Sequence, residues 1–182
     1  MYADAGKGFA DPQAIVTHFH LREGDVVADF GAGSGHYVNA LSKMVGASGR
    51  IHLCEIQRTL IDALSDMARE MRLTNVHVLW GDLEKTQGIK LRDGELDAGL
   101  LSNTLFQLED KENALREVAR IIKKGGKFFI VEWSDSFGGL GPKSTEIVDE
   151  YAAKRLAEDA GFTYERSFPA GDHHYGVAFR RK

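Results

Sequence analysis

The chain has 182 residues, of which 43% are hydrophobic and 27% are charged, and its formal net charge at pH 7 is −4. These values are ordinary for a globular protein, so we expect residues 1–182 to form a single domain with a substantial core. The net charge gives no strong signal for nucleic-acid binding, and the one cysteine, Cys54, excludes an internal disulfide and a cysteine-based metal cluster.

Signals for a membrane or for export are not visible in the sequence. No apolar run is long enough to cross a bilayer, and residues 1–11 are small and polar, without the apolar core of a signal peptide. We therefore expect a cytoplasmic protein with no membrane partner.

The first predicted helix lies within residues 1–23. Asp11 can cap its start, and Pro12 suits the first helical position, where the missing N–H of proline is not needed. An apolar face follows at helical spacing, formed by Ile15, Val16 and Phe19.

A buried strand that runs into a glycine-rich turn is the most informative feature of the chain. The strand at 26–30 is followed by Gly31, Gly33 and Gly35, with a helix after them. Glycine permits positive φ and lets a ligand approach the main chain closely. The start of a helix also offers unpaired N–H groups to an anionic group. The turn therefore predicts a site for a nucleoside-like cofactor.

The spacing of the glycines distinguishes between two classes of cofactor. The dinucleotide fingerprint is G-x-G-x-x-G, and its third position falls here on His36. A nucleotide-dependent oxidoreductase is therefore the less favoured alternative, and binding of NADH would revive it.

Two further strands are predicted to end in acidic residues. The strand at 50–55 ends in Glu55, about 20 residues past the turn, where a ribose-binding carboxylate is expected. The next runs from Val76 and is followed by Gly81 and Asp82.

The helices are predicted from apolar stripes and from capping residues. One follows the glycine turn and ends at Gly46, and the next carries a stripe from Ile56 to Met71. Another is capped by Asp110 and is expected to end at Gly125.

The C-terminal part predicts one helix and a pair of strands. The helix is expected over about 143–159, with Tyr151 facing inward. Residues 162–168 and 175–179 alternate like the two strands of a hairpin. Because strands and helices alternate before this point, we expect a parallel sheet with helices on both faces.

A glycine motif and the four landmarks that follow it in order carry a resemblance to a known family. The D-x-G-x-G-x-G sequence at 29–35 resembles motif I of the class I S-adenosylmethionine-dependent methyltransferases. Glu55, Asp82, the strand at 96–103 and the helix, Gly-Gly turn and strand at 115–130 resemble the landmarks that follow it. The chain is most similar to compact members related to quinone-biosynthesis C-methyltransferases.

The resemblance implies an α/β fold. Its expected form is a Rossmann-like, doubly wound, seven-stranded and mostly parallel sheet, with strand order 3-2-1-4-5-7-6. Strand 7 is expected to be antiparallel, and helices are expected on both faces.

The resemblance also implies S-adenosyl-L-methionine as the cofactor. Glu55 is expected at the ribose, Asp82 at the adenine amino group, and Asp29 as the residue that orients the glycine turn through its N–H groups. The full set of expected cofactor-binding residues is Asp29, Gly31, Ala32, Gly33, Gly35, Glu55, Ile56, Gly81, Asp82, Leu83 and Asn103.

Methyl transfer requires alignment of the reactants more than acid–base groups, so no catalytic triad is expected. The weak candidates for contact with the substrate are His36, Asn103 and His173; a lone histidine is more often structural or solvated, and Asn103 could belong to an ordinary loop. No metal site is expected.

The sequence thus predicts transfer of a methyl group, by in-line displacement, to a small-molecule acceptor. The alternative is a catalytically silent S-adenosylmethionine-binding scaffold or sensor. Because the chain has little beyond the core, residues 1–23 could serve as a lid, or a second subunit of a homodimer could supply one.

Overall fold

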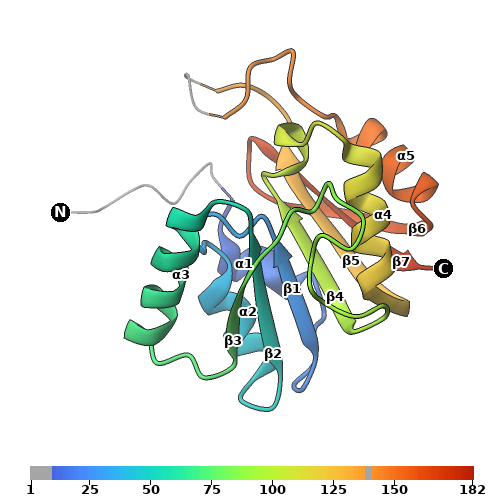
Figure 1. Cartoon of the computed structure of the whole chain (residues 1–182). Helices are drawn as coiled ribbons and strands as arrows, with labels where there is room; N and C mark the ends of the chain where they lie inside the picture. The colour runs from blue at the N-terminus through green and yellow to red at the C-terminus, as the bar shows by residue number, and fades with distance from the viewer. Residues whose placement is uncertain (1–9, 138–140) are drawn as a thin grey trace.

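A seven-stranded sheet with the order β3-β2-β1-β4-β5-β7-β6 forms the centre of the protein (Figure 1). The computed structural model describes residues 10–137 and 141–182. The strands are β1 (Val26–Phe30), β2 (Arg50–Glu55), β3 (Val76–Trp80), β4 (Leu96–Ser102), β5 (Ile122–Trp133), β6 (Phe162–Pro169) and β7 (His174–Arg181).

The pairing of the strands confirms the predicted sheet. β1 lies between β2 and β4 and pairs in parallel with both, β2 pairs in parallel with β3, and β4 pairs in parallel with β5. β7 pairs antiparallel with both β5 and β6. The strand order therefore reverses at β1, where the carboxyl ends of β1 and β4 leave a crevice for a ligand.

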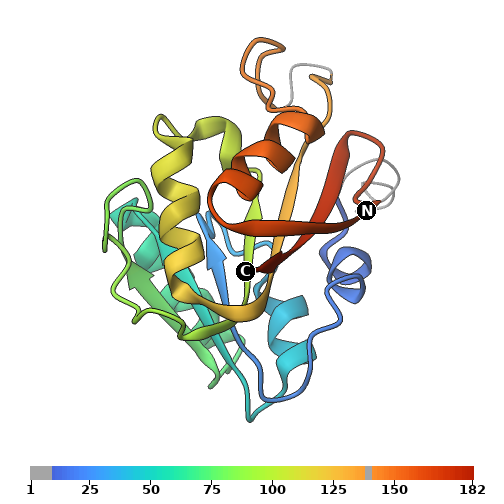
Figure 2. The same ribbon diagram turned by 90° about the vertical axis from the view of Figure 1, so that its right-hand side faces the viewer.

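Helices cover both faces of the sheet, as predicted (Figure 2). On one face, α1 (Pro12–Thr17), α2 (Val38–Val45) and α3 (Arg58–Glu70) contribute to one apolar cluster. On the other, α4 (Lys111–Ile121) and α5 (Glu150–Asp159) contribute to a second. Successive residues of β1 enter opposite clusters, so this strand is buried on both sides, as is usual in a parallel sheet.

The predicted N-terminal helix forms and belongs to the core. The Asp11 carboxylate accepts the Gln13 N–H at 3.0 Å, and Pro12 is the first helical residue. Phe19, just beyond the helix, stacks on Phe129 of β5 with ring centroids 4.0 Å apart. Within the predicted lid, residues 10–23 thus include a packed helix, and residues 1–9 lie outside the described residues.

Two helix boundaries differ from prediction. α4 ends at Ile121 rather than at Gly125, because Ile122 is already extended and pairs with Leu96 of β4. α5 begins at Glu150 rather than near residue 143, because the Asp149 carboxylate accepts the Ala152 N–H at 2.7 Å and caps the helix there.

Inward orientation was also predicted wrongly at two places. Tyr151, predicted to face inward, is 70% exposed. The apolar stripe predicted from Ile56 to Met71 is shorter, since both residues lie outside α3 and are exposed.

The glycine-rich turn after β1 packs against two neighbouring elements. Gly31, Gly33 and Gly35 all have positive φ. A Cβ atom on Gly31 would lie 2.6 Å from Thr104 Oγ1, and one on Gly35 would lie 2.9 Å from Leu64 Cδ2 and overlap Met67, both of α3. A Cβ atom on Gly33 would meet only Gly31 O, at 3.9 Å. Gly35 therefore fixes the turn onto α3, whereas Gly33 faces open space.

The different surroundings of Gly33 and Gly35 predict different costs of substitution. Gly33→Ala adds only the strain of a positive φ, about 1–2 kcal/mol. Gly35→Ala adds a similar strain and also overpacks α3, at a further cost of about 1–3 kcal/mol. Urea unfolding of the two variants beside the parent chain measures the difference. Equal destabilisation by the two substitutions would contradict the packing described for Gly35.

Candidate functional site

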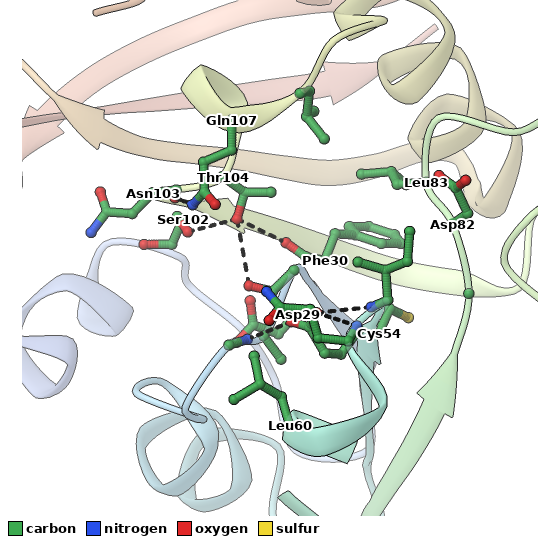
Figure 3. A pocket seen from close by; sticks show the side chains of 18 of the residues that line it. Asp29, Phe30, Cys54, Leu60, Asp82, Leu83, Ser102, Asn103, Thr104 and Gln107 are labelled. Atoms are coloured by element: carbon green, nitrogen blue, oxygen red, sulfur yellow. Dashed lines mark hydrogen bonds between the residues drawn. The ribbon is translucent and has the colours of Figure 1, made fainter. Parts of the chain in front are cut away.

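A cavity of about 690 Å³ opens at the carboxyl ends of β1, β2, β3 and β4. This is the crevice position at which ligands bind in open α/β sheets, and its volume suits a small molecule or cofactor. In Figure 3, Asp29 and Cys54 lie centrally, with Ser102 and Asn103 on one side and Asp82 and Leu83 on the other.

The structure brings together most of the cofactor-binding residues expected from the sequence. Ten of the eleven line this cavity: Asp29, Gly31, Ala32, Gly33, Glu55, Ile56, Gly81, Asp82, Leu83 and Asn103. Gly35 is not among the lining residues, because it faces α3.

Glu55 ends β2 and holds the glycine turn. Its side chain is 5% exposed. Oε2 accepts the Gly33 N–H at 3.0 Å, and Oε1 accepts the N–H groups of Ile56 and Gln57, both at 2.9 Å. A carboxylate has about four acceptor positions, so these three bonds leave capacity for a ligand hydroxyl.

Asp29 is the most buried acid of the cavity wall, with 2% of its surface exposed. Burial, and secondly the negative charge of Glu55, raises the pKa of Asp29 to about 7. The sequence predicts that Asp29 orients the turn through its N–H groups. In the structure, it is Glu55 that accepts the Gly33 N–H. The N–H groups of Gly31 and Ala32 donate instead to the carbonyl oxygen of Cys54.

The β3 side of the cavity combines one acid with apolar side chains. Asp82 Oδ1 accepts the Glu84 N–H at 2.9 Å, so the residue caps its own turn while lining the cavity. Leu83 is buried beside it. Ile89 and Leu60 also line this region and were not anticipated from the sequence, because they come from a loop and a helix without a motif.

The β4 side is fixed by Thr104. Its hydroxyl lies 2.9 Å from Ser102 O and 3.4 Å from Gly31 O, and so connects the end of β4 to the turn after β1. Asn103 has a φ of +50°, and its carbonyl oxygen accepts the Gln107 side-chain N–H at 2.7 Å. The short 3-10 helix η1 (Leu105–Gln107) continues this wall.

The three candidates for substrate contact separate into two groups. His36 and Asn103 line the cavity, and His36 Nε2 lies 3.3 Å from Ala10 O. His173 lies outside the lining, where Nδ1 is 2.8 Å from Asp135 Oδ1 and the ring stacks on Phe137. Tyr37, a buried lining residue, was not predicted, since its position after the turn reads as part of a helix.

The described residues offer neither a metal site nor a membrane-spanning helix. Residues 10–137 and 141–182 contain no group of three or more His, Cys, Asp or Glu side chains placed to hold a metal ion. Within the same ranges, no helix has the length and apolar character that a bilayer crossing requires.

Comparison with known sequences identifies a family. Residues 28–130, more than half of the chain, match the family described as "Methyltransferase domain". A curated relative, the ubiquinone/menaquinone biosynthesis C-methyltransferase UbiE of Enterobacter sp. (strain 638), is 34% identical over 118 residues. That alignment covers 63% of this chain and 45% of the relative, so the chain spans about half the length of the relatives that it matches.

Solved structures show the same fold. A SAM-dependent methyltransferase from Aquifex aeolicus superposes with a TM-score of 0.86 at 29% identity, covering 94% of this chain and 89% of that chain. The [4+2]-cyclase SpnF superposes with a TM-score of 0.77 at 16% identity, covering 93% of this chain and 80% of that chain. The fold alone therefore does not decide the reaction.

The sequence match extends from β1 to β5 and so includes the elements that build the cavity. The chain therefore belongs to the Methyltransferase domain family, the class I S-adenosylmethionine-dependent methyltransferases, and is similar to the ubiquinone/menaquinone biosynthesis C-methyltransferases.

Proposed function

We propose that this chain binds S-adenosylmethionine in the cavity and transfers its methyl group to a small-molecule acceptor. The observation that carries the proposal is the convergence of Asp29, Glu55 and Asp82, from three different strand ends, on one cavity beside an open glycine.

The residues present fit the cofactor. The Glu55 carboxylate has acceptor capacity for a ribose hydroxyl, and such charge-assisted bonds are strong. Asp82 lies on the β3 side, where an adenine amino group would find an acceptor between Leu83 and Ile56. Gly33 presents bare main chain to the cavity, so the methionine part can approach the turn closely.

The chemistry requires little from the protein beyond alignment. When bound, S-adenosylmethionine would supply a methyl group activated by its sulfonium: the acceptor would bond to the methyl carbon in line as the carbon–sulfur bond breaks and its electron pair stays on sulfur, and an acceptor that attacks through a protonated atom would release that proton. Holding the acceptor close and aligned supplies most of the acceleration. We propose that His36 and Asn103, which line the cavity, contact the acceptor there.

The acceptor class is inferred from the named relatives. They are C-methyltransferases of ubiquinone and menaquinone biosynthesis, so a quinone-precursor ring is the first acceptor to test. A chain that bound the cofactor but turned over no acceptor would instead be a scaffold or sensor.

Calorimetric titration with S-adenosylhomocysteine, with NADH as the control, tests the cofactor class. We expect micromolar binding of S-adenosylhomocysteine and none of NADH. Incubation with S-adenosylmethionine and demethylated quinone precursors then tests transfer, with methylated product detected by mass spectrometry. Binding of NADH alone would contradict the proposal.

Glu55→Ala is expected to weaken binding of S-adenosylhomocysteine by about 1.5–3 kcal/mol, the range for hydrogen bonds to charged groups. Glu70→Ala, at the exposed end of α3, is the matched control and should leave the affinity unchanged. Calorimetry on both variants provides the measurement. An unchanged affinity in Glu55→Ala would remove the ribose assignment.

The buried acid Asp29 makes binding of the cofactor pH-dependent. Its pKa of about 7 leaves it partly protonated at neutral pH, and a cationic ligand nearby favours the ionised form. Binding should therefore release a proton, and the affinity for S-adenosylmethionine should rise about tenfold between pH 6 and pH 8.

Calorimetry in two buffers of different ionisation enthalpy measures this proton release. Asp29→Asn should abolish the release, whereas Asp25→Asn, at the amino end of the same strand, should retain it. A wild-type affinity that stays constant from pH 6 to pH 8 would show that Asp29 does not sense the ligand's charge.

A further inference from the structure

A second buried acid lies behind the cavity wall rather than in it. Glu132, near the carboxyl end of β5, is 1% exposed and is not among the residues that line the cavity. Its neighbours on this face of the strand, Phe128 and Ile130, belong to the apolar cluster beneath α4 and α5. Burial of a carboxylate in such a position costs free energy of folding unless its oxygens accept hydrogen bonds.

The side-chain oxygens of Glu132 accept hydrogen bonds from main-chain N–H groups. Oε1 accepts the N–H of Trp133 at 2.9 Å. Oε2 accepts the N–H of Phe106, which lies in η1, at 3.4 Å. The carboxylate thus connects β5 to the 3-10 helix that follows β4.

A cation holds the other end of the same helix. Lys111 Nζ donates to the carbonyl oxygen of Leu108, the residue that caps η1. Negative charge near the start of a helix and positive charge near its end both interact favourably with the helix dipole. Glu132 and Lys111 therefore fix η1 between them.

The anchored segment forms one wall of the cavity. Asn103, Thr104, Gln107 and Leu108 all line it. The Gln107 side chain donates to Asn103 O at 2.7 Å, and this bond helps to keep Asn103 at its positive φ. Displacement of η1 would therefore move both the β4 side of the cavity and the residue proposed to contact the acceptor.

Burial of the Glu132 carboxylate is energetically unfavourable. Burial raises the pKa of Glu132 to about 7, against the effect of the N–H groups and of Lys111, which lower it. The other titratable group opposite it is Tyr175 of β7, whose hydroxyl donates to Val148 O. A buried acid whose oxygens accept main-chain N–H groups is consistent with a role in specifying local structure.

We propose that Glu132 is a positioning residue that holds η1, and with it the Asn103–Leu108 wall of the cavity, in the geometry that receives the acceptor. The inference depends on the proposed function for its effect on methyl transfer, whereas the anchoring itself is tested without the cofactor.

Glu132→Gln tests the anchoring, because it preserves volume but turns one acceptor oxygen into a donor that faces an N–H group. Hydrogen exchange of the Phe106 amide should become about tenfold faster or more, while amides of Leu100 and Ile130 keep their protection. At pH 8 the melting temperature should not fall, since the variant removes a buried charge. The control is Asp97→Asn, which alters a carboxylate that accepts the Val26 N–H at 2.9 Å at the opposite end of the sheet.

A measurement on the wild-type protein covers the case in which the variant does not fold. The amide proton resonances of Phe106 and Trp133 should titrate with the same apparent pKa as the side-chain carboxyl carbon of Glu132, because a bonded N–H follows the ionisation of its acceptor. Independent titration of these groups would overturn the proposal, as would a uniform rise in exchange over the whole of Glu132→Gln.

The effect on the site is measured separately. Glu132→Gln should raise the KM for the acceptor and lower kcat more than it changes the affinity for S-adenosylhomocysteine, because the cofactor is held mainly by residues of β1, β2 and β3. If the wild-type chain binds no S-adenosylhomocysteine, the proposed function fails, and the exchange and titration results still decide the role of Glu132.

Discussion

The hydrogen bond between the Glu55 carboxylate and the Gly33 N–H is the contact on which the rest of the site depends. It connects the end of β2 to the turn after β1, at the point where the strand order reverses. The same carboxylate accepts the first two N–H groups after β2, so one side chain orients both loops. Because a ligand hydroxyl would share these oxygens, the residue that shapes the cavity is also the residue proposed to recognise the cofactor.

Three acids stand near the carboxyl ends of β1, β2 and β5, and their environments differ. Glu55 is stabilised by N–H groups on both oxygens. Asp29, deeper and beside that negative charge, has a pKa raised to about 7, so it can respond to a cation in the cavity. Glu132 lies behind the wall and bonds the main chain of η1. Burial and hydrogen bonding, rather than residue type, therefore distinguish the three acids, and the different roles proposed for them rest on these environments.

Most residues that line the cavity at the ends of β1, β2 and β3 could be predicted from the sequence because their signals are local. An acid at the end of an apolar run and alternating glycines follow directly from what a parallel strand and a tight turn require. The prediction errors arose where contacts between residues distant in the sequence determine the local structure. Nothing local to Ile122 shows that it pairs with Leu96 and ends α4, and the Asp149 cap competes with a helical pattern that begins earlier. Gly35 resembles Gly33 in the sequence, yet only the folded chain shows that it meets α3.

The support of the Asn103–Leu108 wall could not be predicted, because it too depends on contacts between residues distant in the sequence. Glu132 reads as one polar residue in a strand, and its connection to Phe106 crosses 26 residues of sequence. The cavity wall that it supports comes from η1, a segment too short to carry a periodic pattern. A fold shared with a [4+2]-cyclase shows that the same architecture can serve different chemistry. The proposed acceptor contacts of this chain lie in the Asn103–Leu108 wall, which Glu132 anchors and where sequence motifs are least informative.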